Sequence, residues 1–97
     1  MTINKNQNEQ TVTLALVGRL DTTTAPDLEK EIDALDNVKE LIFDLKELEY
    51  TSSAGLRAIL KAQKMMNEKG AMKVVNVNDT IMEVFEITGF TDMLTIE

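Results

Sequence analysis

Two stretches within the first twenty residues have polar and apolar positions in patterns that favour β-strands. Residues 2–7 are polar and alternate weakly, which is typical of a strand at the edge of a sheet. Residues 11–17 are rich in β-branched side chains and place alternate apolar residues on one face, as a half-buried strand does. Asn8 and Glu9 indicate a turn between the two stretches. We therefore expect a β-hairpin whose second strand ends at Gly18.

After a loop at residues 19–23, helical spacing alternates with short apolar runs. Apolar residues at i, i+3 and i+4 predict helices, and short runs rich in Val, Ile or Phe predict strands. The predicted helices cover residues 24–35, 53–69 and 79–88, with a further helical turn at 90–94. The predicted strands cover residues 38–45, 72–77 and 95–96, and the first of them is followed by an acidic connection at 46–50.

The resulting order, β β α β α β α, is that of an α/β protein. Alternation of strands and helices implies right-handed crossovers and a mostly parallel sheet, with the first hairpin strand antiparallel. We predict a single small domain over residues 1–97, with a mixed four- to five-stranded sheet and three to four helices. The apolar faces of these elements predict eight nearly buried side chains: Leu28, Ile32, Ile42, Leu56, Ile59, Leu60, Val74 and Phe85.

Composition narrows the classes of function that the chain can have. It carries 10 Lys and Arg against 17 Asp and Glu, a net charge of −7, which argues against binding to nucleic acid. No run of basic residues indicates an anionic membrane surface. Cysteine and histidine are absent, which removes thiol chemistry, the commonest general base and the commonest metal ligand. We therefore expect no catalytic residue, no metal and no cofactor.

The sequence also bears on where the protein works. Its N-terminal residues lack the apolar core of a signal peptide. No stretch approaches the apolar length needed to cross a bilayer. A cytoplasmic protein is the simplest expectation.

Two hydroxyl residues, Ser52 and Ser53, stand at the predicted start of the central helix. Serine commonly caps a helix, because its oxygen accepts a hydrogen bond from a free backbone N–H. The same position also suits a phosphate, because the helix dipole and the free N–H groups favour negative charge. Gly55 predicts close packing and also access for a partner, and both can hold. Asp21 predicts a turn that bonds nearby backbone. Arg57 is either a solvated residue or a support for a phosphate one turn back.

These residues belong to a set of short motifs that resembles the STAS domains, the bacterial anti-sigma-factor antagonists. The likeness covers essentially the whole chain, and its landmarks occur in the family's order. They are Gly18-Arg19-Leu20-Asp21, Thr24-Ala25-Pro26, Leu41 to Leu45, Tyr50, Ser52-Ser53-Ala54-Gly55-Leu56 and Gly89-Phe90.

The resemblance implies a partner-switching protein. Such a domain binds an anti-sigma factor that is also a serine kinase of the GHKL type. The kinase phosphorylates a Ser or Thr at the start of the central helix, and the phosphorylated form lets go. A metal-dependent serine phosphatase then restores the first state, so the domain is a substrate and a binding module and not an enzyme.

The sequence departs from the best-known family pattern, D-[ST]-[ST]-G-L-G, at the site of phosphorylation. The acidic position falls on Ser52, the usual acceptor position on Ala54, and Arg57 replaces a glycine. Ser53 is the first candidate for the acceptor because it is nearest the aligned position, and Ser52 is the second. The resemblance implies contact with the partner around this site by Asp21, Thr22, Tyr50, Thr51, Ser52, Ser53, Gly55 and Arg57.

A rival interpretation keeps the fold and drops the switch. In it the chain is a constitutive STAS scaffold, or an accessory subunit of a larger assembly or a transporter, with no phosphate cycle. Incorporation of phosphate by a cognate kinase separates the two interpretations.

Overall fold

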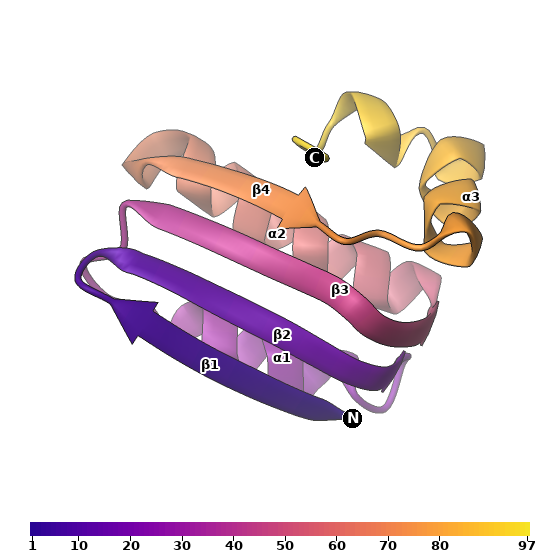
Figure 1. Cartoon of the computed structure of the whole chain (residues 1–97), viewed down its shortest axis with the longest axis horizontal. Coiled ribbons are helices and arrows are strands. Elements are labelled where there is room, and N and C mark those ends of the chain that lie inside the picture. The colour runs from indigo at the N-terminus through magenta and orange to yellow at the C-terminus, as the bar shows by residue number, and fades with distance from the viewer.

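The computed structural model describes residues 1–97 and contains a four-stranded mixed sheet with three α-helices. The strands lie in the order β1-β2-β3-β4, with β1 antiparallel to β2 and the other pairs parallel (Figure 1). The elements in chain order are β1 (Thr2–Asn8), β2 (Thr11–Leu20), α1 (Ala25–Asp33), β3 (Glu40–Thr51), α2 (Ser53–Lys69), β4 (Ala71–Val75), α3 (Asp79–Thr88) and the 3-10 turn η1 (Phe90–Asp92). The predicted hairpin, α/β class and mixed sheet are confirmed.

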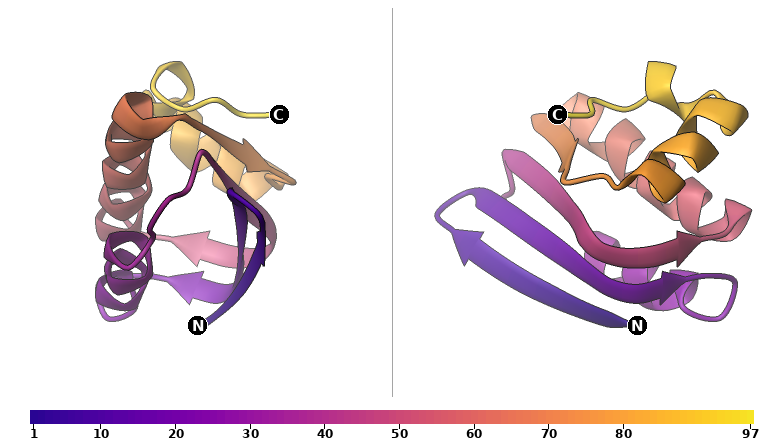
Figure 2. Two further views of the ribbon diagram at one scale, coloured as in Figure 1. Left: turned by 90° about the vertical axis from the view of Figure 1, so that its left-hand side faces the viewer. Right: turned by 45° about the vertical axis from the view of Figure 1, so that its right-hand side comes forward.

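Helices α1 and α2 lie side by side on one face of the sheet, as the left view of Figure 2 shows. Helix α3 lies at the end of the sheet, next to β3 (Figure 1). The core between these layers holds 23 buried hydrophobic residues, nearly all of them aliphatic. Alternate residues of β2 and β3 supply its sheet side: Val12, Leu14 and Leu16, and Leu41, Phe43 and Leu45.

Six of the eight side chains expected to be nearly buried are at most 2% exposed, and the other two are half-buried. The expectation was wrong for Ile42 because neighbouring strand residues point to opposite faces, and Leu41 and Phe43 take the face covered by helices. It was wrong for Leu60 because this residue lies on the flank of the buried stripe of α2.

The middle strands are longer than predicted. Strand β2 continues past Gly18 to Leu20, and β3 runs through residues 46–50, which were expected to form a loop, as far as Thr51. Two register shifts place an extra residue of β3 opposite β2 each time, as in a β-bulge. A bulge interrupts the alternation of inward and outward side chains, so residues 46–50 lack the sequence pattern that predicts a strand. Gly18, with φ 101°, provides the unusual backbone angle next to the second shift.

The C-terminal strand predicted at residues 95–96 is reduced to one parallel bridge, between Ile96 and Val74. Strand β4 also ends two residues earlier than predicted, at Val75, and Asn76 then takes a positive φ of 58°. The sheet therefore has four strands, the lower of the two predicted numbers.

Candidate functional site

Ser52 caps helix α2. Its Oγ accepts a hydrogen bond from the Gly55 backbone N–H at 3.3 Å, and its own N–H donates to the Leu20 carbonyl at 2.8 Å. Ser52 is half-buried. The capping interpretation thus holds for this serine, which also fastens the start of α2 to the end of β2.

Ser53 is the first residue of α2 and is exposed, and its hydroxyl makes no hydrogen bond within the chain. The N–H groups of Ser53 and Ala54 belong to the first turn, where no helical carbonyl can accept from them. Helices α1 and α3 carry an acid in their first turn, Asp27 and Asp79, and α2 carries none. The first turn of α2 therefore contains no acidic side chain of its own to offset the positive end of the helix dipole.

Gly55 and Thr51 are buried beneath this helix start. A Cβ on Gly55 would lie 2.6 Å from Leu20 Cγ and 2.6 Å from Thr51 Oγ1. Thr51 is 3% exposed, and its hydroxyl donates to the Ser52 carbonyl. The structure assigns Gly55 the close-packing role, and neither residue presents a side chain to a partner; both set the position of Ser52 and Ser53.

The loop before α1 is organised by the Asp21 carboxylate. Its Oδ1 accepts from the Thr23 hydroxyl at 2.7 Å and from the backbone N–H groups of Thr23 and Thr24. The hydrogen bond from the Thr23 hydroxyl is the largest cause that lowers the pKa of Asp21. Desolvation opposes it as the second-largest cause, and the remaining hydrogen bonds from Thr23 and Thr24 lower the pKa further. Asp21 is thus held ionised in a fixed orientation, with Thr22 exposed beside it.

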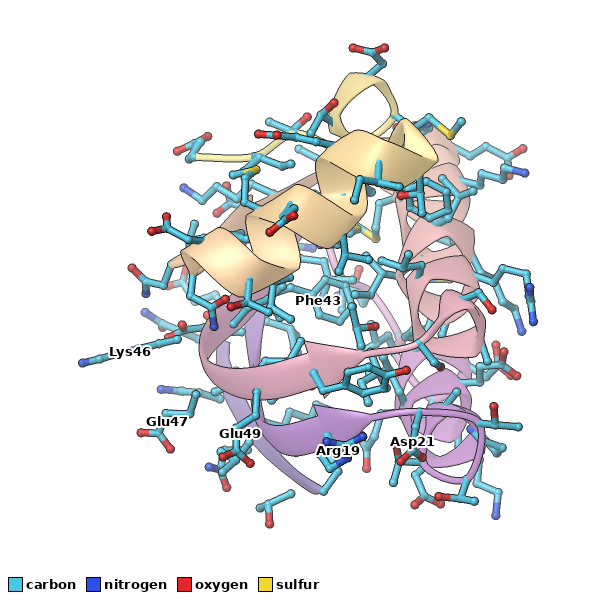
Figure 3. All side chains as sticks on the ribbon, turned by 90° about the vertical axis from the view of Figure 1, so that its right-hand side faces the viewer. Arg19, Asp21, Phe43, Lys46, Glu47 and Glu49 are labelled. Carbon is cyan, nitrogen blue, oxygen red and sulfur yellow. The ribbon has the colours of Figure 1, made fainter.

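Arg19 and Tyr50 form a pair at the end of the two middle strands. They are register partners in β2 and β3, and the Arg19 guanidinium lies 4.3 Å from the centre of the Tyr50 ring, a cation–π contact. Tyr50 is 39% exposed. Figure 3 shows Arg19 and Asp21 projecting from the end of β2 and the loop that follows it. Arg19 is not among the site residues predicted from the sequence, because only the parallel register of β2 and β3 brings it next to Tyr50.

We call the exposed part of this region the α2 amino-terminal surface. Two segments distant in sequence meet there, because the Ser52 N–H binds the Leu20 carbonyl. Arg57 extends the surface along α2; it is exposed and forms no ion pair. The surface consists of Arg19, Asp21, Thr22, Tyr50, Ser52, Ser53 and Arg57.

The structure contains no group of three or more acidic side chains placed to hold a metal ion. None of its helices combines the length and the apolar character that crossing a bilayer demands. The α2 amino-terminal surface thus combines a free hydroxyl, an unneutralised helix start and a fixed carboxylate. Of these groups, only the serine hydroxyl has the chemistry to form a phosphate ester.

Comparison with known proteins gives matches along the whole chain. A family model described as STAS domain matches residues 2–97. The anti-sigma-B factor antagonist of Bacillus subtilis (strain 168) is 29% identical over 96 residues, which covers 97% of this chain and 88% of that protein. The putative anti-sigma factor antagonist BtrV of Bordetella bronchiseptica is 33% identical over 84 residues, covering 84% of this chain and 72% of the relative.

Solved structures show the same fold at lower identity. An anti-sigma factor antagonist from Mycobacterium paratuberculosis superposes with a TM-score of 0.89 at 23% identity, covering 98% of this chain and 83% of that one. The anti-sigma factor antagonist SpoIIAA in its unphosphorylated form gives 0.85 at 19% identity, with 99% and 88% covered. The phosphorylated form of the Bacillus SpoIIAA gives 0.78 at 19% identity, with 99% and 91% covered. On the family match over residues 2–97, this chain belongs to the STAS domain family.

Proposed function

We propose that this protein is an anti-sigma factor antagonist of a partner-switching pathway in the cytoplasm. In its unphosphorylated state it binds an anti-sigma factor that is a serine kinase of the GHKL type, and phosphorylation releases it. A metal-dependent serine phosphatase resets the cycle. The protein itself is the substrate and the binding module, with no catalysis of its own. Relatives named as anti-sigma factor antagonists support this role over 97% and 84% of the chain.

The observation that carries the proposal is the free hydroxyl of Ser53 at an unneutralised helix start. A phosphate there lies beside free N–H groups at the positive end of the helix, so the fold tolerates it. Ser52 is the second candidate, because its oxygen is already engaged by the Gly55 N–H and it is half-buried. Phosphorylation of Ser52 would have to disrupt that cap.

The negative charge of the phosphate accounts for release of the partner. A phosphate on Ser53 adds about −1.5 to −2 charges at pH 7. An interface that accommodates a neutral hydroxyl must then desolvate a phosphate, and any facing acid repels it. Like-charge contact at an interface costs several kcal/mol, enough to weaken binding by about a hundredfold or more.

The rest of the α2 amino-terminal surface provides the contact area. Asp21, Thr22, Tyr50 and Arg57 stay in the proposal as contact residues, and Arg19 joins them. Tyrosine and arginine are enriched among residues that dominate binding energy at interfaces. Thr51 and Gly55 act by placement, because they are buried.

The second candidate function is the constitutive STAS scaffold or accessory subunit without a phosphate cycle. One observation favours it: Ala54, which cannot accept phosphate, occupies the usual acceptor position of the family pattern. This alternative predicts binding to a partner that no phosphorylation regulates.

Calorimetry against the cognate kinase tests the proposal. Ser53→Asp, an imperfect mimic, is expected to lose much of its affinity and to keep its thermal stability, whereas Ser53→Ala binds and is not released in ATP. Thr80→Asp is the matched control, because it adds one negative charge to the exposed first turn of another capped helix, α3. It should bind like the wild type.

Mass spectrometry after incubation with kinase and ATP locates the phosphate. A phosphate on Ser53 is expected. Phosphate on Ser52 would transfer the switch to the cap residue. Equal affinity of all variants, with no phosphate incorporated, would establish the scaffold instead.

A further inference from the structure

The outward face of α2 carries three basic side chains in succession: Arg57, Lys61 and Lys64. We call them the basic ridge. All three are exposed, and they surround the half-buried Leu60 in a shallow hollow of about 340 Å³. Positions i, i+4 and i+7 lie on one side of a helix, so the three charges form a continuous row over about two turns.

The ridge inverts the charge of the protein locally. Helix α2 contains four basic residues and one acid, a net charge of +3, within a chain of −7, so the other residues together carry −10. Only Lys61 has an ion pair, at 3.4 Å from Asp33, and both partners are exposed. Such pairs contribute little stability, and Arg57 and Lys64 have no partner at all. The fold therefore makes little use of these charges, and they remain available for a ligand.

Charge complementarity selects an acidic protein surface as that ligand. The chain as a whole is strongly acidic, which opposes approach to a nucleic acid or to an anionic bilayer. Three charges also fall short of the four to eight basic residues typical of lipid-binding clusters. An acidic patch with an apolar centre fits a row of cations around Leu60.

Ser53 connects the ridge to the switch. It is exposed in the same helix, four residues before Arg57. Side chains at i and i+4 are neighbours, and an acid placed N-terminal to a base is the favourable orientation. A phosphate of about −1.5 to −2 charges therefore pairs with Arg57 and offsets about half to two-thirds of the ridge charge.

We propose that the basic ridge docks an acidic surface of the kinase and speeds its association, and that phosphate on Ser53 cancels this attraction. The inference rests on the proposed function for the identity of the partner and of the phosphorylated residue. It adds a second cause of release to direct repulsion. The phosphate neutralises the local positive charge of Arg57 and its neighbours, which attracts the kinase.

Association rates measured by surface plasmon resonance test the ridge. The test variant is Arg57→Gln with Lys61→Gln and Lys64→Gln, and the control is Lys5→Gln with Lys39→Gln and Lys46→Gln, which reaches the same net charge from exposed, unpaired lysines elsewhere. We expect the ridge variant to associate about tenfold more slowly at low salt, the lower end of the range for electrostatic steering, and to lose most of its salt dependence. The control should associate like the wild type, and Lys64→Gln alone should give a smaller loss in the same direction.

A double-mutant cycle tests the link to Ser53. Ser53→Asp should slow association of the wild type more than that of the ridge variant, because the charge it cancels is already missing there. Purely additive effects would overturn the proposed cancellation. Thermal unfolding of each variant confirms that the fold is retained.

The outcomes distinguish failure of the ridge inference from failure of the proposed function. If Ser53→Asp weakens binding and the ridge variant associates normally, the ridge inference falls and the proposed function stands. If both triple variants slow equally, net charge and not the ridge is responsible, and the inference falls. If the wild type does not bind the kinase, both fall together. Binding of phosphatidylserine vesicles by the wild type but not by the ridge variant, with kinase association unaffected, would overturn the inference in favour of a membrane.

Discussion

The two faces of helix α2 differ in both burial and charge. The inward face packs on the sheet with apolar side chains at most 2% exposed, among them Leu56, Ile59, Ala62 and Met66, and its one buried polar side chain, Gln63, is 6% exposed. The outward face is exposed and carries Ser53 and the basic ridge. One face contributes apolar burial and almost no chemistry, and the other contributes charge and almost no packing. A substitution on either face should therefore change one measurement, stability or binding, and leave the other alone.

The two faces meet at the start of the helix. Ser52 and Gly55 hold the end of β2 against α2 from below, while Ser53 stands free above them. Neighbouring residues thus have separate roles. Ser52 and Gly55 anchor the helix start, and this anchoring gives the exposed Ser53 hydroxyl a defined position. Substitutions on the two faces measure how completely the structural and the exposed residues of α2 are separated.

The largest effect is expected for Ile59→Ala. Ile59 is 0% exposed, and truncating a filled core site costs about 2–5 kcal/mol. Leu60→Ala is the matched control at the next position, and because Leu60 is half-buried it should cost about 1 kcal/mol or less. Urea denaturation gives both values. Equal losses would show that the inward and outward faces are not separated as described.

Gly55→Ala should come second. The new Cβ would lie 2.6 Å from atoms of Leu20 and Thr51, and overpacking typically costs about 1–3 kcal/mol. Alanine's better helix propensity returns up to about 1 kcal/mol, so the expected net loss is up to about 2 kcal/mol. Chemical denaturation measures it. A gain in stability would mean that Leu20 moves aside easily and that the packing beneath Ser53 is loose.

Ser52→Ala should cost about 1 kcal/mol, because the side-chain cap on the Gly55 N–H is lost. Ser53→Ala should change stability by less than about 0.5 kcal/mol, because its exposed hydroxyl bonds nothing in the chain. Thermal unfolding of the pair compares the two serines directly. The reverse ranking would make Ser53 the structural residue and Ser52 the free one.

The smallest effect is expected for the contribution of Asp21 to stability at low pH. Hydrogen bonds to the ionised carboxylate lower the pKa of Asp21 in the folded protein. Its contribution to stability is therefore full above the ordinary aspartate value of about 3.9 and is lost as the pH falls through the lowered value. Unfolding of wild type and Asp21→Asn between about pH 6 and pH 2 should show a small wild-type advantage that disappears in acid. An advantage that grows in acid would contradict the hydrogen-bond pattern seen here.

Much of the fold follows from local signals in the sequence. The bounds of α2 were predicted to the residue, because an apolar stripe, serines at its start and Gly70 beyond its end all agree. The hairpin and the class of the fold follow for the same reason. Each depends on residues within a few positions of one another.

Tertiary structure decided the rest, because the contacts join residues distant in sequence. Pairing with β2 extends β3 through two register shifts and brings Arg19 to Tyr50 across 31 positions. Thr51 and Gly55 are buried under the helix start and are therefore not on the surface. The two serines differ because the Ser52 hydroxyl accepts a hydrogen bond from the Gly55 N–H and the Ser53 hydroxyl makes none. The sequence determined that a polar site stands at the start of α2, since caps and periodicity are local. Only the folded chain determined which of its groups face outward, since exposure depends on every element packed around them.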